Sequence, residues 1–126
     1  MTKLAEDIYW VGANDHTTDL FEGVWPLPEG VSYNSYLIDD EKLALVDATK
    51  VDYEDVLLEN IDEIADSAEI DYIIVHHMEP DHTGALPTLR RIAPEAEIVC
   101  TEKATGFLES FYGITENIKT VKTGDE

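Results

Sequence analysis

The chain has 126 residues, enough for one compact domain, and its 44% hydrophobic content is typical of a globular protein. Its 28 acidic and 8 basic residues give a formal net charge of −20, which argues against nucleic acid and anionic lipid as partners because such a surface repels polyanions. No apolar run approaches the ~20 residues that span a bilayer, and the first residues lack the apolar core of a signal peptide, so we expect a cytoplasmic protein.

Short apolar runs in the first half of the chain are typical of β-strands. Strands are predicted over residues 6–12, 32–38 and 43–47. Only a polar turn separates the second strand from the third, so we expect these two to pair as a hairpin. Beyond them, apolar residues recur at helical spacing over residues 52–65, which predicts an amphipathic helix with Asp52 as its N-cap.

A long loop, residues 13–30, separates the first two predicted strands. A loop of this length without regular structure of its own is often functional. It contains two polar and two aromatic residues of interest: His16, Phe21, Glu22 and Trp25. Either these side chains line a pocket, or the aromatic pair attaches the loop to the core, and both interpretations stay open.

The second half of the chain alternates strands with helices. Strands are predicted over residues 71–76, 97–101 and 117–122. One helix ends near Ile92 and has Pro87 in its first turn, where no backbone N–H is needed. The next helix has Thr101 as its N-cap, ends at Gly113, and carries four apolar residues on one face: Ala104, Phe107, Leu108 and Phe111. The order of elements predicts an α/β fold in which helices cover a mixed sheet.

Cys100 is the only cysteine, so no disulfide can form within the chain. It lies in an apolar run that is predicted to be a strand. We therefore expect a buried structural thiol and not a catalytic one.

Four potential metal ligands lie within six residues, here called the ligand segment (residues 77–82): His77, Glu79, Asp81 and His82. The segment follows the apolar strand 71–76, and α/β proteins place their sites at the carboxyl ends of strands. Two imidazoles and two carboxylates without a thiolate suit iron, manganese or zinc. Side chains alternate along a strand, so His77 is the candidate ligand and His76 is expected to pack or hydrogen-bond nearby. Pro80 favours an extended Glu79.

The ligand segment also has a purely structural interpretation, as a solvated acidic loop before a helix. Asp81 or Thr83 would then be an N-cap, and His82 a surface histidine. Four ligands in six residues favour a metal site over this interpretation. Because Asp81 and His82 are neighbours, their side chains diverge, and the four ligands can serve two ions instead of one.

The pattern His-x-Glu-x-Asp-His of residues 77–82 resembles the proximal metal motif of the flavodiiron proteins, or A-type flavoproteins, within the metallo-β-lactamase fold superfamily. Hydrolases of that superfamily carry His-x-His-x-Asp-His and bind zinc. Glu79 stands where they have their second histidine, and this exchange marks the flavodiiron branch because a carboxylate there favours iron. Other segments resemble the family in the same order along the chain: residues 7–12, 31–38, 44–47, 81–87 and 121–124.

The resemblance implies a metallo-β-lactamase-like αββα sandwich with a non-haem di-iron centre. By position, His77 and Glu79 would bind one iron, and Asp81 and His82 the other. Asp47, at a strand end, would orient a histidine ligand, or else is simply a turn residue. His16 and Glu22 fall in a loop that lies near the site in the family. No residue of this chain is expected to bind FMN.

In the family, electrons pass from FMN to the di-iron centre, which reduces dioxygen to water or nitric oxide to nitrous oxide. Reduced rubredoxin or a deazaflavin is the implied electron donor. FMN sits in a flavodoxin-like domain and approaches the irons only across a head-to-tail dimer. The resemblance therefore also implies a homo-oligomer.

The family's site needs two further histidines, a bridging carboxylate and the flavodoxin-like domain, which residues 1–126 do not include. The resemblance thus implies that these residues are the N-terminal part, about the first half, of the metallo-β-lactamase-like domain. One alternative is a zinc-dependent hydrolase of the same fold that uses a metal-bound hydroxide, although Glu79 argues against it. The other is a truncated, non-enzymatic remnant, which the abrupt end after residues 123–126 favours.

Overall fold

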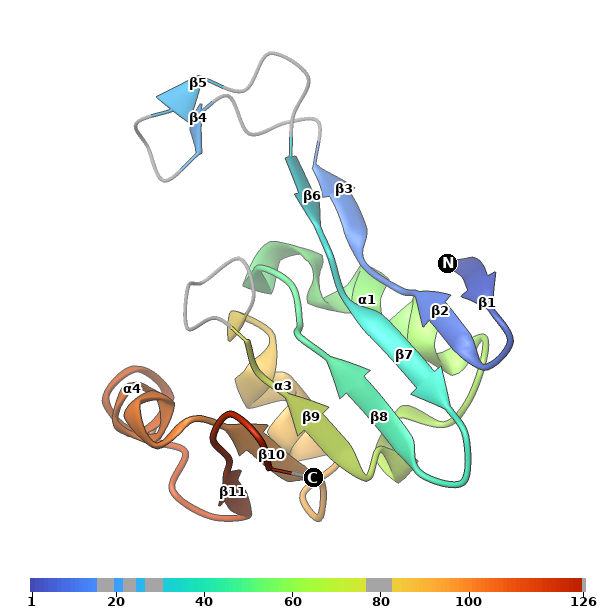
Figure 1. Ribbon diagram of the computed structural model, residues 1–126. Helices are drawn as coiled ribbons and strands as arrows, with labels where there is room; N and C mark the ends of the chain where they lie inside the picture. The colour runs from blue at the N-terminus through green and yellow to red at the C-terminus, as the bar shows by residue number, and fades with distance from the viewer. Residues whose placement is uncertain (16–19, 22–24, 27–30, 77–82, 126) are drawn as a thin grey trace.

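The computed structural model describes residues 1–15, 20–21, 25–26, 31–76 and 83–125, which build a mixed seven-stranded sheet with helices packed against it (Figure 1). The strands, in sheet order, are β1 (Thr2–Ala5), β2 (Ile8–Trp10), β7 (Tyr36–Asp39), β8 (Leu43–Val46), β9 (Tyr72–Ile74), β10 (Glu97–Cys100) and β11 (Ile118–Thr120). Strands β1, β2, β7 and β8 pair antiparallel, and β8 to β11 pair parallel. The predicted mixed sheet and the hairpin of β7 and β8 are confirmed.

The described helices connect the parallel strands and lie on one face of the sheet. They are α1 (Glu54–Asp62), α3 (Leu86–Ile92) and α4 (Glu102–Tyr112), with short 3-10 helices η1 (Val51–Tyr53) and η2 (Ser67–Glu69) on either side of α1. Each α-helix contributes side chains to the same core cluster. The helix residues in this cluster include Leu57 and Ile61 from α1, Leu86 and Leu89 from α3, and Ala104 and Leu108 from α4.

The sheet contributes one row of side chains to that core. Leu37, Leu45, Ile73 and Ile98 lie opposite one another across β7, β8, β9 and β10, and each is 0% exposed. Because successive side chains of a strand point to opposite faces, this row marks the helix-covered face. None of the described helices is long and apolar enough to cross a membrane.

Near the N-terminus the structure differs from the prediction. The strand predicted over residues 6–12 is regular only in β2, and Asp7 turns the chain with a φ of 66° after the additional strand β1. All residues of β1 are exposed, so no apolar alternation indicated this strand.

The described residues within 13–30 are in strands, which differs from the irregular loop that was predicted. Strand β3 (Ala13–Asp15) pairs with β6 (Val31–Tyr33), and β4 (Leu20–Phe21) pairs with β5 (Trp25–Pro26). Together they form an arm that extends beyond the sheet (Figure 1). The strand predicted over residues 32–38 is consequently two strands, β6 in the arm and β7 in the sheet.

A close backbone contact explains why the arm leaves the sheet at a glycine. A Cβ atom added to Gly12 would lie 1.9 Å from the carbonyl oxygen of Tyr33, so only glycine fits between the two chain segments. At the same point the Trp10 indole N–H donates to the Asn34 side chain at 3.0 Å. These contacts interrupt the strand between β6 and β7.

The helix ends test the predicted caps. Thr101 accepts a hydrogen bond from the Ala104 N–H, and Gly113 ends α4 in the left-handed conformation, so both predicted caps of this helix are confirmed. The predicted N-cap Asp52 is wrong, because it lies within η1 and α1 begins after Tyr53 without a side-chain cap. Because the 3-10 helix η1 occupies residues 51–53, α1 begins only at Glu54.

The predicted apolar face of α4 is only half buried. Ala104 and Leu108 lie in the core, whereas Phe107 and Phe111 are 38% and 61% exposed and stack on each other at 5.7 Å between ring centroids. The reason is the position of α4 beside β11, at the edge of the sheet, where too little surface is available to cover the whole apolar stripe.

Cys100 is buried at the end of β10, as predicted, with 2% of its surface exposed. Burial raises the pKa of its thiol, so at neutral pH the nucleophilic thiolate is disfavoured. We expect iodoacetamide to modify Cys100 in urea but not in the native protein, as measured by the mass of the intact chain. Labelling of the native chain at the rate of an exposed thiol would contradict this placement.

Candidate metal centre

The predicted site lies at the carboxyl edge of the sheet, where two neighbouring parallel strands end. Strand β8 ends at Val46 and β9 at Ile74, and these residues are register partners. The ligand segment follows β9 after Val75 and His76. The predicted ligands His77, Glu79, Asp81 and His82 lie outside the described residues, as do the predicted pocket residues His16 and Glu22. The site is therefore described through the residues that border the segment.

Asp47 is the central polar residue at this edge. It follows β8 directly, is 7% exposed, and has a φ of 59°, a left-handed conformation that Asp and Asn tolerate better than most residues. Its own N–H donates to the Ile74 carbonyl at 2.8 Å, which joins it to β9. Its carboxylate is thereby held beside the last residue before the ligand segment.

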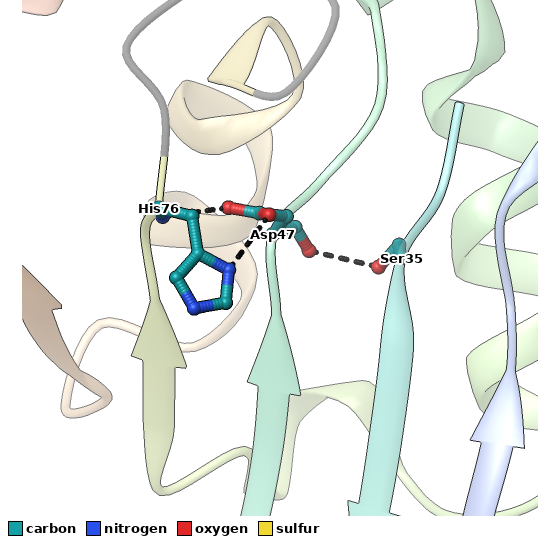
Figure 2. A network of polar contacts seen from close by, with 3 residues as sticks. All are labelled: Ser35, Asp47 and His76. Atoms are coloured by element: carbon teal, nitrogen blue, oxygen red, sulfur yellow. Dashed lines mark hydrogen bonds and ion pairs between the residues drawn. The ribbon is translucent and has the colours of Figure 1, made fainter. Parts of the chain in front are cut away.

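The Asp47 carboxylate makes two contacts with His76 (Figure 2). One oxygen accepts a hydrogen bond from the His76 N–H at 2.8 Å, and the other lies 3.1 Å from the Nδ1 atom of the ring. The second ring nitrogen, Nε2, points away from Asp47 (Figure 2). A carboxylate that engages one ring nitrogen fixes the orientation of the ring, which is how metal-binding proteins commonly position histidines.

A buried serine just before the adjacent strand β7 hydrogen-bonds to Asp47 from the other side. The hydroxyl of Ser35, which is 0% exposed, donates to the Asp47 carbonyl at 2.8 Å (Figure 2). This contact satisfies a backbone acceptor at the point where the chain turns into the left-handed conformation. Ser35, Asp47 and His76 thus form a chain of contacts across β7, β8 and β9, but the serine contacts a backbone carbonyl and is not part of a nucleophilic triad.

The residue that follows the ligand segment contacts a different element. Thr83, the first described residue after it, is 0% exposed, and its hydroxyl lies 2.7 Å from the Tyr112 hydroxyl at the end of α4. Two residues later the Ala85 N–H donates to the Thr49 carbonyl at 3.0 Å. The residues that flank the segment, His76 and Thr83, are therefore bound to the sheet edge and to α4.

Part of this arrangement was predicted from the sequence. His76 hydrogen-bonds beside the segment, as predicted, and Asp47 contacts a histidine, although that histidine is not one of the predicted ligands. The supporting residues Ser35 and Tyr112 were missed, since their partners lie 12 and 29 positions away in the sequence. Within the described ranges, no group of three or more His, Cys, Asp or Glu residues could hold a metal ion.

The sequence pattern of the family described as ODP family beta lactamase matches residues 31–126. The chain belongs to this family. The matched range includes the sheet from β7 onward, Asp47 and the ligand segment. The resemblance to flavodiiron proteins and their metallo-β-lactamase-like fold is confirmed by the relatives of this ODP-family chain.

The ODP-family chain is similar to three proteins with names that describe redox functions or a flavodiiron protein. It is 38% identical to a nitric oxide reductase of Moorella thermoacetica over 96% of its own length and 31% of the relative's. The rubredoxin oxygen:oxidoreductase of Desulfovibrio gigas superposes with a TM-score of 0.94 at 34% identity, over 98% of this chain and 31% of that one. The flavodiiron protein of Giardia intestinalis superposes with a TM-score of 0.90 at 31% identity, over 96% of this chain and 30% of that one. The chain thus spans about a third of the length of these relatives.

Proposed function

We propose that residues 1–126 form the N-terminal part of a di-iron domain in a flavodiiron oxidoreductase. The reaction is the reduction of dioxygen to water or of nitric oxide to nitrous oxide. The observation that carries the proposal is the position of the ligand segment, between β9 and α3, next to a sheet edge where Asp47 holds a histidine ring. The names of the relatives include both an oxygen and a nitric oxide reductase, so they support the class of reaction and leave both gases as candidates.

The proposed ligands fit iron by their chemistry. His77 and Glu79 bind one ion and Asp81 and His82 the other, because imidazole and carboxylate donors suit ferrous iron and leave positions open for a gas. When bound, the iron pair supplies the electrons and the open coordination positions for the reaction. His16 and Glu22 are proposed to lie beside this site.

The described residues have a positioning role in this proposal. Asp47 fixes the start of the ligand segment through the backbone and the ring of His76, and Tyr112 fixes its end through Thr83. Anchoring both ends restricts the conformations of the segment before a metal binds, so less entropy is lost on binding. Because Asp47 is nearly buried, its carboxylate is little screened by solvent.

We assign the remaining functions to parts of the protein outside residues 1–126. FMN is held by a flavodoxin-like domain and passes electrons to the irons, and reduced rubredoxin or a deazaflavin supplies them. We further propose a cytoplasmic homo-oligomer. These assignments rest on the names of the relatives and on the family resemblance, and none of them requires a binding site in the described residues.

The identity of the bound metal tests the proposal. We expect the purified chain to bind ferrous iron under anaerobic conditions, and Glu79→Ala to reduce its affinity by about 10-fold or more, since a direct ligand is lost. Glu79→His recreates the His-x-His-x-Asp-His pattern and is expected to shift the ratio of the two affinities toward zinc. Both affinities are measured by titration with Fe(II) and Zn(II) in competition with a coloured chelator.

Glu95→Ala is the matched control, because Glu95 is an exposed glutamate in the turn before β10, at the opposite edge of the sheet. It should leave both affinities unchanged. If the chain bound no iron, or if Glu79→Ala bound iron as tightly as the unaltered chain, the di-iron proposal would be wrong. A preference for zinc in the unaltered chain would favour the hydrolase alternative.

A further inference from the structure

The acidic residues of the chain are concentrated around α1. From residue 51 to residue 89 the sequence has acidic residues throughout but no lysine or arginine. This stretch includes η1, α1 and η2. The exposed acidic residues on these three helices and on the turn between α1 and η2 are Asp52, Asp55, Glu59, Asp62, Glu63, Asp66 and Glu69. The solvent-facing side of α1 therefore carries charge of one sign.

Like charges are neighbours along α1. Side chains four positions apart lie on the same face of a helix, with their Cβ atoms about 5–6 Å apart. Glu59 consequently has one carboxylate neighbour in the preceding turn, Asp55, and another in the following turn, Glu63, and all three residues are exposed. Pairs of like charge at this spacing destabilise a helix, whereas a carboxylate paired with a lysine would stabilise it.

The C-terminal end of α1 adds a second unfavourable interaction. The helix dipole places partial negative charge at this end, where a lysine or arginine is stabilising. The last turn of α1 has no basic residue, and the helix ends with Asp62 and its C-cap Glu63. Asp62 accepts a hydrogen bond from the Ser67 N–H at 3.0 Å, which joins α1 to η2. Its charge and that of Glu63 nevertheless oppose the dipole.

The basic residues of the protein do not neutralise this surface. All eight lysines and arginines lie in the described ranges, and only Lys50 forms an ion pair with a described carboxylate, that of Asp52 at 3.5 Å. This pair is exposed to solvent, where an ion pair contributes little stability. Arg90 donates instead to the backbone carbonyls of Pro94 and Ala96, at 3.0 and 2.7 Å. Self-repulsion therefore opposes the compact state of the chain.

We propose that this fold is adapted to high ionic strength, with monovalent inorganic cations as the counter-charge that the surface of α1 lacks. At about 0.1 M salt the screening length is ~10 Å, longer than the spacing of neighbouring carboxylates on α1, so their repulsion persists. At about 1 M it falls to ~3 Å, below that spacing, and the repulsion is largely removed. The chain is therefore marginally stable at low salt and works at molar salt. This inference does not depend on the proposed metal site.

Urea unfolding in KCl from about 0.1 to 1 M and above, followed by far-UV circular dichroism, tests the proposal. The urea midpoint of the unaltered chain is expected to rise with the KCl concentration, most steeply below about 1 M, where the screening length crosses the carboxylate spacing. A chain that is unfolded at low salt should fold as KCl is added. An unchanged midpoint over this range, or a chain that stays unfolded at every KCl concentration, would overturn the proposal.

Glu59→Lys is the decisive variant, because it converts two repulsive pairs, with Asp55 and Glu63, into attractive ones without removing a buried side chain. At about 0.1 M KCl it should lower the equilibrium constant for unfolding at least 3-fold, and this gain should shrink at about 1 M. The rise of its urea midpoint with KCl should accordingly be smaller than that of the unaltered chain.

Glu102→Lys is the matched control. It changes the net charge by the same amount at an exposed position, but Glu102 lies in the first turn of α4, where a carboxylate is favourable to the helix dipole. It should therefore not stabilise the chain as Glu59→Lys does. If Glu59→Lys kept the full salt dependence of the unaltered chain, or if Glu102→Lys stabilised the chain equally, the repulsion would not originate in α1 and the proposal would be wrong.

Discussion

Asp47→Ala is expected to lower the free energy of unfolding by about 2–4 kcal/mol. Two effects add up. The His76 N–H loses its acceptor, and alanine must adopt the left-handed φ of 59° that Asp47 has in the native chain. Urea unfolding followed by circular dichroism measures the change. In the folded variant we also expect ferrous iron to bind about 10–100-fold more weakly, because the start of the ligand segment is no longer held.

Asp47→Asn separates the two effects of this substitution. Asparagine tolerates the left-handed conformation and keeps an oxygen that can accept from the His76 N–H, but it loses the negative charge. We expect it to retain most of the stability, with a change below about 1 kcal/mol, and to bind iron more weakly than the unaltered chain. If Asp47→Ala were as stable as Asp47→Asn, neither the lost hydrogen-bond acceptor nor the left-handed backbone would contribute to the free energy of unfolding.

Leu45→Ala is expected to lower the free energy of unfolding by about 2–5 kcal/mol. Leu45 lies in the centre of the sheet between Leu37 and Ile73, and all three are 0% exposed. Removing its side chain leaves a cavity between the sheet and the helices that rigid neighbours cannot fill. The shift of the urea midpoint, at an unchanged slope, measures the loss.

Leu4→Ala is the control for this prediction. The same atoms are removed from a strand, but Leu4 lies in β1 at the sheet edge and is 55% exposed. Its effect should stay within about 0.5 kcal/mol. Equal effects of the two substitutions would mean that the core does not lie between β8 and the helices.

Local patterns in the sequence predicted the elements that local interactions define. The polar turn between β7 and β8 indicated a hairpin, and Thr101 and Gly113 marked the ends of α4 because capping involves residues only a few positions apart. The ligand segment stood out for the same reason, since its donors are close together in the chain. The family resemblance added the fold class, which short-range patterns alone left as a mixed α/β sheet.

The features that were missed depend on contacts between distant parts of the chain. Strand β1 exposes all its side chains, so it leaves no apolar pattern. The arm requires the pairing of β3 with β6, which is not visible in either segment alone. The exposure of Phe107 and Phe111 follows from the edge position of α4, because helical spacing shows which residues share a face but not how much of that face is covered.

The contacts at His76 and Thr83 set the span that the intervening residues must bridge. One residue is bound to the end of a strand and the other to the last turn of a helix, and the distance between those attachment points is set by the packed body of the protein. We therefore expect a substitution between the two contacts to change metal binding while both contacts persist, and an insertion or deletion there to strain one of them.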